Sequence, residues 1–72
     1  MDEKILSIMR DVFEDETIDS TVSQTNHENW DSLRHLSFIS ELEEEFDVEF
    51  EPEEIAEMSS FDKVKEVLSS KC

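Results

Sequence analysis

The fold is decided by residues 30–47, which read WDSLRHLSFISELEEEFD. From residue 33 onward, apolar side chains recur every three or four residues, as on one face of an α-helix, and glutamates fill the opposite face. Asp31 is a helix-capping residue type and stands directly before this pattern. We therefore predict a helix over residues 32–46 with Asp31 as its N-cap. The predicted apolar stripe consists of Leu33, Leu36, Phe38, Ile39, Leu42 and Phe46, with Leu33 expected to remain outward beside Ser32.

Three further helices are expected around this one. Residues 3–14 have helical apolar spacing, with Asp2 as a plausible N-cap. Pro52, a favoured first residue of helices, starts a short helix that runs to about Met58. Ser59 or Ser60 then caps a fourth helix. The inward residues expected on the first helix are Ile5, Ile8, Met9, Val12 and Phe13, and those on the fourth are Phe61, Val64, Val67 and Leu68.

Residues 15–30 lack this periodicity and are rich in Thr, Ser, Asn and Asp. We expect a long loop here, anchored on the core by Ile18, Val22 and Trp30, and we find no internal repeat or linker. Residues 48–50 alternate in polarity, but the run is too short for a convincing strand. The predicted fold is all-α: a single domain over residues 1–72, built as a small four-helix bundle with a short third helix and a long loop between the first two helices.

The composition limits the classes of partner. The 72 residues include 21 acidic and 6 basic side chains, a formal net charge of −15. Such a surface repels phosphate backbones and anionic lipids, so neither nucleic acid nor membrane is expected as a direct partner. It favours partners with basic surfaces. With no apolar run of membrane-spanning length, no signal-like start and a single Cys72, we expect a cytoplasmic monomer without an internal disulfide.

Ser32 is the candidate functional residue. A serine at the start of a helix faces the positive end of the helix dipole and backbone N–H groups that can hold an anion. A phosphodiester on this hydroxyl would be stabilised there, and Arg34 and an exposed His35 are expected to contact the phosphate or an acidic partner residue. A Ser32–His35 nucleophilic pair is the enzymatic alternative, a small hydrolase, but the sequence offers it no recognisable orienting group or oxyanion hole.

No dedicated metal site is expected. The chain has no zinc-ligand spacing, and without glycine it lacks the calcium-loop pattern and glycine-rich phosphate loops. The glutamates of residues 43–45 and 51–54 are expected to bind divalent ions only weakly, as relief of charge repulsion.

Over about residues 30–70 the chain resembles the acyl carrier protein family. The resemblance is carried by Trp30-Asp31-Ser32-Leu33, by the LEEEFD segment at residues 42–47 and by the PEE segment at residues 52–54. It implies that Ser32 receives 4′-phosphopantetheine from coenzyme A through a separate phosphopantetheinyl transferase, with Asp31 and Leu33 as motif flanks. Trp30 stands where fatty-acid carriers usually have glycine, which resembles specialised stand-alone carriers.

The resemblance also implies roles for further residues. Partner enzymes that transfer, ligate or condense acyl groups would dock through basic surfaces. The partner-binding residues expected are Leu33, Arg34, Leu36, Glu43 and Glu44. An acyl chain folded back into the bundle would be lined by Phe46, Phe50, Ile55, Val64 and Leu68.

The function expected is a stand-alone acyl carrier, not itself an enzyme. It would carry acyl intermediates as thioesters on the arm of Ser32, for fatty-acid-like or specialised biosynthesis. Two alternatives remain open at this point. One is an aminoacyl or peptidyl carrier, which the identity of the cargo would distinguish. The other is an acidic interaction module without modification, in which Ser32→Ala leaves function intact.

The excess of carboxylates predicts a salt-dependent stability. Raising NaCl from about 10 to about 200 mM shortens the Debye length severalfold and screens the repulsion between carboxylates, so the melting temperature is expected to rise. Thermal unfolding followed by circular dichroism measures this shift. An unchanged melting temperature would contradict the expectation.

Overall fold

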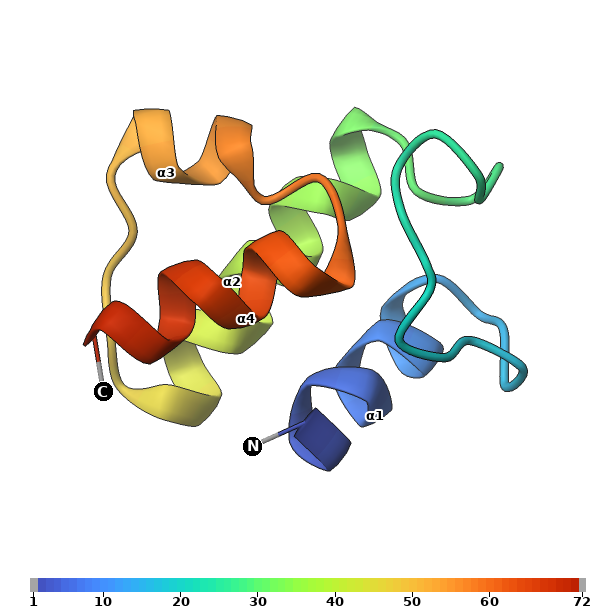
Figure 1. Ribbon diagram of the computed structural model, residues 1–72, viewed down its shortest axis with the longest axis horizontal. Helices are drawn as coiled ribbons and strands as arrows, with labels where there is room; N and C mark the ends of the chain where they lie inside the picture. The colour runs from blue at the N-terminus through green and yellow to red at the C-terminus, as the bar shows by residue number, and fades with distance from the viewer. Residues whose placement is uncertain (1, 72) are drawn as a thin grey trace.

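Four α-helices build the fold in the computed structural model, which describes residues 2–71 (Figure 1). They are α1 (Asp2–Val12), α2 (Ser32–Phe46), α3 (Pro52–Glu57) and α4 (Phe61–Lys71). Residues 2–71 contain no β-strand, only an isolated bridge between Ser23 and Ser60. The prediction of an all-α fold with four helices, the third of them short, is therefore confirmed.

The helix ends differ in detail from the predictions. The first helix stops at Val12 because Glu14 adopts a left-handed backbone with φ 55°, and Asp15 N–H closes the end on the carbonyl of Arg10 at 3.0 Å. Asp2 lies inside α1, so its prediction as an N-cap is wrong; its carboxylate pairs with Lys65 at 3.1 Å. Ser60 does cap α4, since its hydroxyl accepts a hydrogen bond from the N–H of Lys63 at 3.2 Å.

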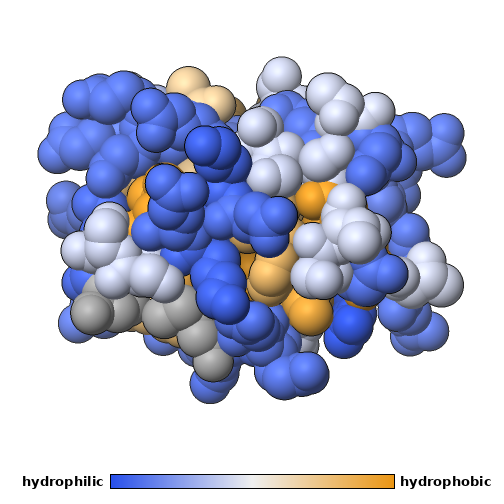
Figure 2. Space-filling model, viewed as in Figure 1, coloured by the Kyte–Doolittle hydropathy of each residue, from blue (hydrophilic) through white to orange (hydrophobic). Residues whose placement is uncertain are grey.

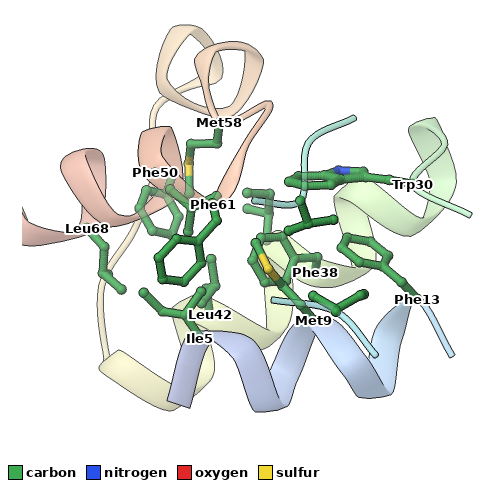
Figure 3. Packing of buried hydrophobic residues seen from close by; sticks show 14 residues of the cluster. Ile5, Met9, Phe13, Trp30, Phe38, Leu42, Phe50, Met58, Phe61 and Leu68 are labelled. Atoms are coloured by element: carbon green, nitrogen blue, oxygen red, sulfur yellow. The ribbon is translucent and has the colours of Figure 1, made fainter. Parts of the chain in front are cut away.

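One hydrophobic core joins all four helices and the long loop (Figure 3). At its loop end, the Phe13 ring stacks on Trp30 with centroids 4.8 Å apart, and Phe38 meets Trp30 edge-on at 6.0 Å. Hydrophilic side chains cover most of the face seen in Figure 2, with small hydrophobic areas between them. The buried apolar residues are Ile5, Met9, Phe13, Ile18, Val22, Trp30, Phe38, Ile39, Leu42, Phe50, Met58, Phe61, Val64 and Leu68.

The apolar stripe of α2 is rotated relative to the prediction. Leu36 was expected to face inward, but it is 55% exposed. The buried positions are His35, Phe38, Ile39 and Leu42, which keep the three- and four-residue spacing of a helix face. His35 therefore takes the inward place, because the fold supplies hydrogen-bond partners for both of its ring nitrogens. Leu33 remains outward, as predicted, at 79% exposure.

The long loop between α1 and α2 is held by a repeated turn that the sequence analysis missed. Residues 15–18 (DETI) and 19–22 (DSTV) repeat the pattern Asp-x-Thr-aliphatic. In both copies the aspartate accepts hydrogen bonds from the N–H and the hydroxyl of the threonine two residues later. The aliphatic residues, Ile18 and Val22, are buried, so two of the predicted anchors are confirmed, and Trp30 is the third.

Both arginines of the chain tie this loop and α2 to the end of α1. Arg10 Nε donates to the carbonyl oxygen of Ile18 at 3.0 Å, and Arg34 Nη1 donates to that of Val12 at 2.7 Å. These carbonyls lie at or beyond the C-terminus of α1, where backbone acceptors lack helical partners. Among residues 2–71, no helix has the length and apolar content needed to cross a membrane.

Helix α2 carries one fully buried leucine, Leu42, and one highly exposed leucine, Leu33, which can be compared by the same substitution. Leu42→Ala is expected to lower the free energy of unfolding by about 2–5 kcal/mol, because Leu42 is fully buried and its loss leaves a cavity. Leu33→Ala is expected to change it by less than about 0.5 kcal/mol. Urea unfolding followed by the fluorescence of Trp30 measures both. Equal effects of the two substitutions would contradict the inward and outward assignment.

Candidate functional site

The site starts at the N-terminus of α2, where Asp31 caps the helix. Asp31 has an extended backbone (φ −96°, ψ −177°), and its Oδ1 accepts a hydrogen bond from the N–H of Arg34 at 2.9 Å. Its carbonyl oxygen accepts the first helical bond, from the N–H of His35 at 2.8 Å. The predicted cap is thereby confirmed, and Ser32 is the first residue of the helix.

Ser32 is exposed, and its hydroxyl has no hydrogen-bond partner among residues 2–71. The N–H groups of the first two helical residues, Ser32 and Leu33, have no partner within a helix, and Asp31 takes the N–H of the third. An anion attached to Ser32 would therefore share the positive end of α2 with the Asp31 carboxylate. The hydroxyl is open to a modifying enzyme without any rearrangement of the fold.

The outer face of α2 consists of its exposed residues and divides into two parts. Leu33 and Leu36 give the part next to Ser32 an uncharged, partly apolar character, and carboxylates occupy the part further along the helix. Glu45 is paired with Lys4 at 3.2 Å, with both side chains well exposed. The residues of the outer face are Ser32, Leu33, Leu36, Ser37, Ser40, Glu41, Glu44 and Glu45.

Two of the predicted partner-binding residues lie apart from this face. Glu43 is half-buried, and its Oε2 accepts a hydrogen bond from the N–H of Phe50 at 2.9 Å. The Arg34 guanidinium donates to the Val12 carbonyl, and its Nη2 lies 3.7 Å from Glu14 Oε2. Both side chains thus serve contacts within the molecule. Of the five predicted residues, Leu33 and Leu36 lie next to Ser32 on the outer face, and Glu44 lies on the same face further along the helix.

His35 is buried, at 9% exposure, so the prediction of an exposed histidine is wrong. Its Nδ1 accepts a hydrogen bond from Trp30 Nε1 at 2.8 Å, and its Nε2 donates to the carbonyl oxygen of Ile55 at 2.8 Å. Both ring nitrogens are therefore occupied, and neither is free to accept a proton from Ser32. The geometry contradicts a Ser32–His35 nucleophilic pair. His35 stands three residues after the start of an amphipathic helix and five residues after Trp30, whose indole N–H needs an acceptor when it is buried. This sequence pattern is the local signal that could have indicated a buried histidine.

The residues predicted to line an acyl chain all belong to the hydrophobic core or pack against it. Phe50, Val64 and Leu68 are buried in the cluster, and Phe46 and Ile55 pack against it from its edge. The ammonium of Lys71 lies 5.6 Å from the centre of the Phe50 ring and pairs with Glu54 of α3 at 2.9 Å.

No metal centre emerges from the described residues. Between residues 2 and 71, no three or more His, Cys, Asp or Glu side chains are placed to hold one ion. Cys72 lies outside the described residues. The weak divalent binding expected from the glutamate runs stays a prediction.

The cap at Asp31 can be tested by two substitutions. Asp31→Ala is expected to lower the free energy of unfolding by about 1 kcal/mol relative to Asp31→Asn, because asparagine keeps a capping oxygen whereas alanine leaves the Arg34 N–H without its partner. Both variants remove the same negative charge, so repulsion changes equally in the two. Urea unfolding measures the difference, and equal stabilities of the two variants would contradict the capping role.

The chain was also compared with known proteins. No model of a protein family, no curated protein and no solved structure matches it. The resemblance to acyl carrier proteins therefore depends on the residues of the chain itself.

Proposed function

We propose that the protein is a carrier whose Ser32 bears a 4′-phosphopantetheine arm, on which acyl groups travel as thioesters. The observation that carries this proposal is the position of Ser32: an exposed, unbonded hydroxyl at the first residue of α2, directly after a cap that holds the helix start in place. Of the residues that carry the resemblance to acyl carrier proteins, Trp30, Asp31 and Leu33 flank Ser32 at this helix start.

The proposed modification needs only an accessible nucleophile from this chain. The Ser32 Oγ attacks the β-phosphorus of coenzyme A on a separate transferase. The bond between that phosphorus and the bridging oxygen breaks, 3′,5′-ADP leaves, and the hydroxyl proton passes to a base of the transferase. The product is a phosphodiester, and the thiol at the far end of the arm then accepts the acyl group. The buried, fully bonded His35 supports placing the base on the transferase.

The outer face of α2 suits recognition by successive enzymes. Leu33 and Leu36 offer apolar contact next to the attachment point, and Glu41 and Glu44 offer negative charge further along the helix. A partner with an apolar depression rimmed by lysine or arginine is complementary to this arrangement. A contact limited to the outer face of one helix is small, which fits transient docking, in which each enzyme releases the carrier after one step.

In the proposed carrier, α3 is the helix that an acyl chain would displace to enter the core. This six-residue helix contributes no buried residue, and its half-buried Ile55 packs against the edge of the core. An element with few buried contacts opens at low cost in free energy. A short acyl chain that enters the core would therefore do so by displacing α3 more readily than any other helix.

Intact mass after incubation with coenzyme A, Mg²⁺ and a broad-specificity phosphopantetheinyl transferase tests the proposal. The parent chain is expected to gain one phosphopantetheine and Ser32→Ala none. Ser37→Ala is the matched control, because Ser37 is an exposed serine on the same face of α2, and this variant is expected to gain one arm as the parent does.

Failure of a folded parent chain to gain mass, with this transferase and with the one encoded in its own genome, would overturn the carrier proposal. The unmodified acidic interaction module would then be the better account. Gain of an arm followed by loading with an aminoacyl group in place of an acyl group would assign the chain to the aminoacyl or peptidyl carriers.

A further inference from the structure

A hydrogen-bonded chain through the core links the loop, α2 and α3. The Trp30 indole N–H donates to Nδ1 of His35, and Nε2 of His35 donates to the carbonyl oxygen of Ile55, both at 2.8 Å. The indole nitrogen is only a donor and the carbonyl only an acceptor. The ring must therefore be neutral, with its proton on Nε2 and Nδ1 bare.

The position of α3 depends strongly on this ring. Among residues 2–71, the bond from His35 to Ile55 is the hydrogen bond that joins α3 to α2, and α3 has no buried side chain of its own. It is also held by the half-buried Ile55 side chain, which packs against the core, and by the ion pair between Glu54 and Lys71, whose side chains are 26% and 22% exposed. On the far side of the ring, Trp30 is fixed by its stack on Phe13.

A second proton on His35 would break the chain at Trp30. Protonated Nδ1 carries an N–H that faces the indole N–H, so two donors meet and the acceptor is lost. A buried donor without an acceptor is costly, as is a buried charge without a partner. The stability contributed by this chain of bonds is present while the ring is neutral and is lost as falling pH protonates it.

The charged groups around the ring do not offset this cost. On α2, the Asp31 carboxylate is bound to the Arg34 N–H, and the Arg34 guanidinium is bound to Val12 beside Glu14. On α3, Glu54 is bound to Lys71 of α4 and to the N–H of Glu51. Of the carboxylates in residues 2–71, none forms an ion pair with His35.

His27, the second histidine, is also bonded through both ring nitrogens: its Nδ1 accepts a hydrogen bond from the N–H of Asn29 at 3.2 Å, and a carboxylate lies on the other side of the ring. Its Nε2 lies 2.8 Å from Asp15 Oδ2. Hydrogen bonds from the Thr17 hydroxyl and N–H, and then from His27, lower the pKa of Asp15 to about 2. Asp15 therefore stays charged near neutral pH and keeps an acceptor for the ring of His27.

We propose that His35 is a pH-sensitive positioning residue, which in its neutral form holds the indole of Trp30 and on protonation releases it, while Nε2 of the ring keeps its bond to Ile55 of α3 and the rest of the core stays packed. The inference depends on contacts of the unmodified chain and not on the proposed function. Its tests use no transferase, so failure here and failure of the carrier proposal are separate results.

The first test reads the ring itself. Long-range ¹H–¹⁵N NMR of the parent chain is expected to show His35 at neutral pH with a protonated Nε2 and a bare Nδ1. A proton on Nδ1, in the other tautomer or in an imidazolium, would overturn the proposal. This measurement needs no variant and is decisive even if substitutions at residue 35 prevent folding.

The second test compares acid responses between about pH 7.5 and 5.5, above the usual titration range of carboxylates. Protection of the Trp30 indole proton from exchange, corrected for the intrinsic rate, is expected to fall about tenfold on acidification, as loss of one buried hydrogen bond implies. The Trp30 indole N–H signal should shift over the same pH range, whereas the amide signals of Ile5 and Met9 in α1 should not.

Two single substitutions assign this response. His35→Gln keeps an acceptor and a donor on one side chain but does not titrate, so the acid response is expected to disappear. His27→Gln, the matched control, is expected to retain it. Persistence of the response in His35→Gln, or its disappearance in His27→Gln, would show that another group drives the change and would overturn the proposal.

Discussion

The contact between Trp30 and His35 is the constraint on which the rest of the structure depends. The indole ring stacks on Phe13 at the end of α1, meets Phe38 of α2 edge-on, and donates its N–H to His35, which in turn holds the Ile55 carbonyl of α3. A polar donor can enter a core this small only if it finds an acceptor there. His35 is that acceptor, and its second nitrogen joins α2 to α3.

The carboxylates of the chain serve both as exposed surface charges and as hydrogen-bond acceptors within the fold. Many carboxylates form the exposed faces of the helices, but several accept hydrogen bonds from backbone N–H groups. Asp15 and Asp19 close the two loop turns, Asp31 caps α2, and Glu43 holds the chain at Phe50. Without glycine, the turns of this protein depend on such side-chain acceptors. The two arginines likewise serve backbone carbonyls near the end of α1.

Some of these internal contacts hold the residues on either side of Ser32 in place. Asp31 before it and His35 after it are both fixed by hydrogen bonds, so the hydroxyl is presented from a rigid helix start while its surroundings remain open to solvent. Next to it, Leu33 and Leu36 are exposed because His35 and Phe38 take the inward positions. The arrangement that buries a histidine is thus the same one that leaves two leucines available for contact beside the proposed attachment point.

What the sequence determined by itself is the local structure. The helix over residues 32–46, its cap at Asp31, the helix start at Pro52, a serine cap at residue 59 or 60, the outward Leu33 and the anchoring of the loop all follow from spacing and residue type, because each depends on neighbours within a few positions. The DETI–DSTV repeat was also visible in the sequence and was missed. Only the tertiary structure decided that His35 is inward and Leu36 outward, and that Arg34 and Glu43 serve internal contacts. Their partners lie 5 to 22 residues away along the chain, and packing of the whole core selects them.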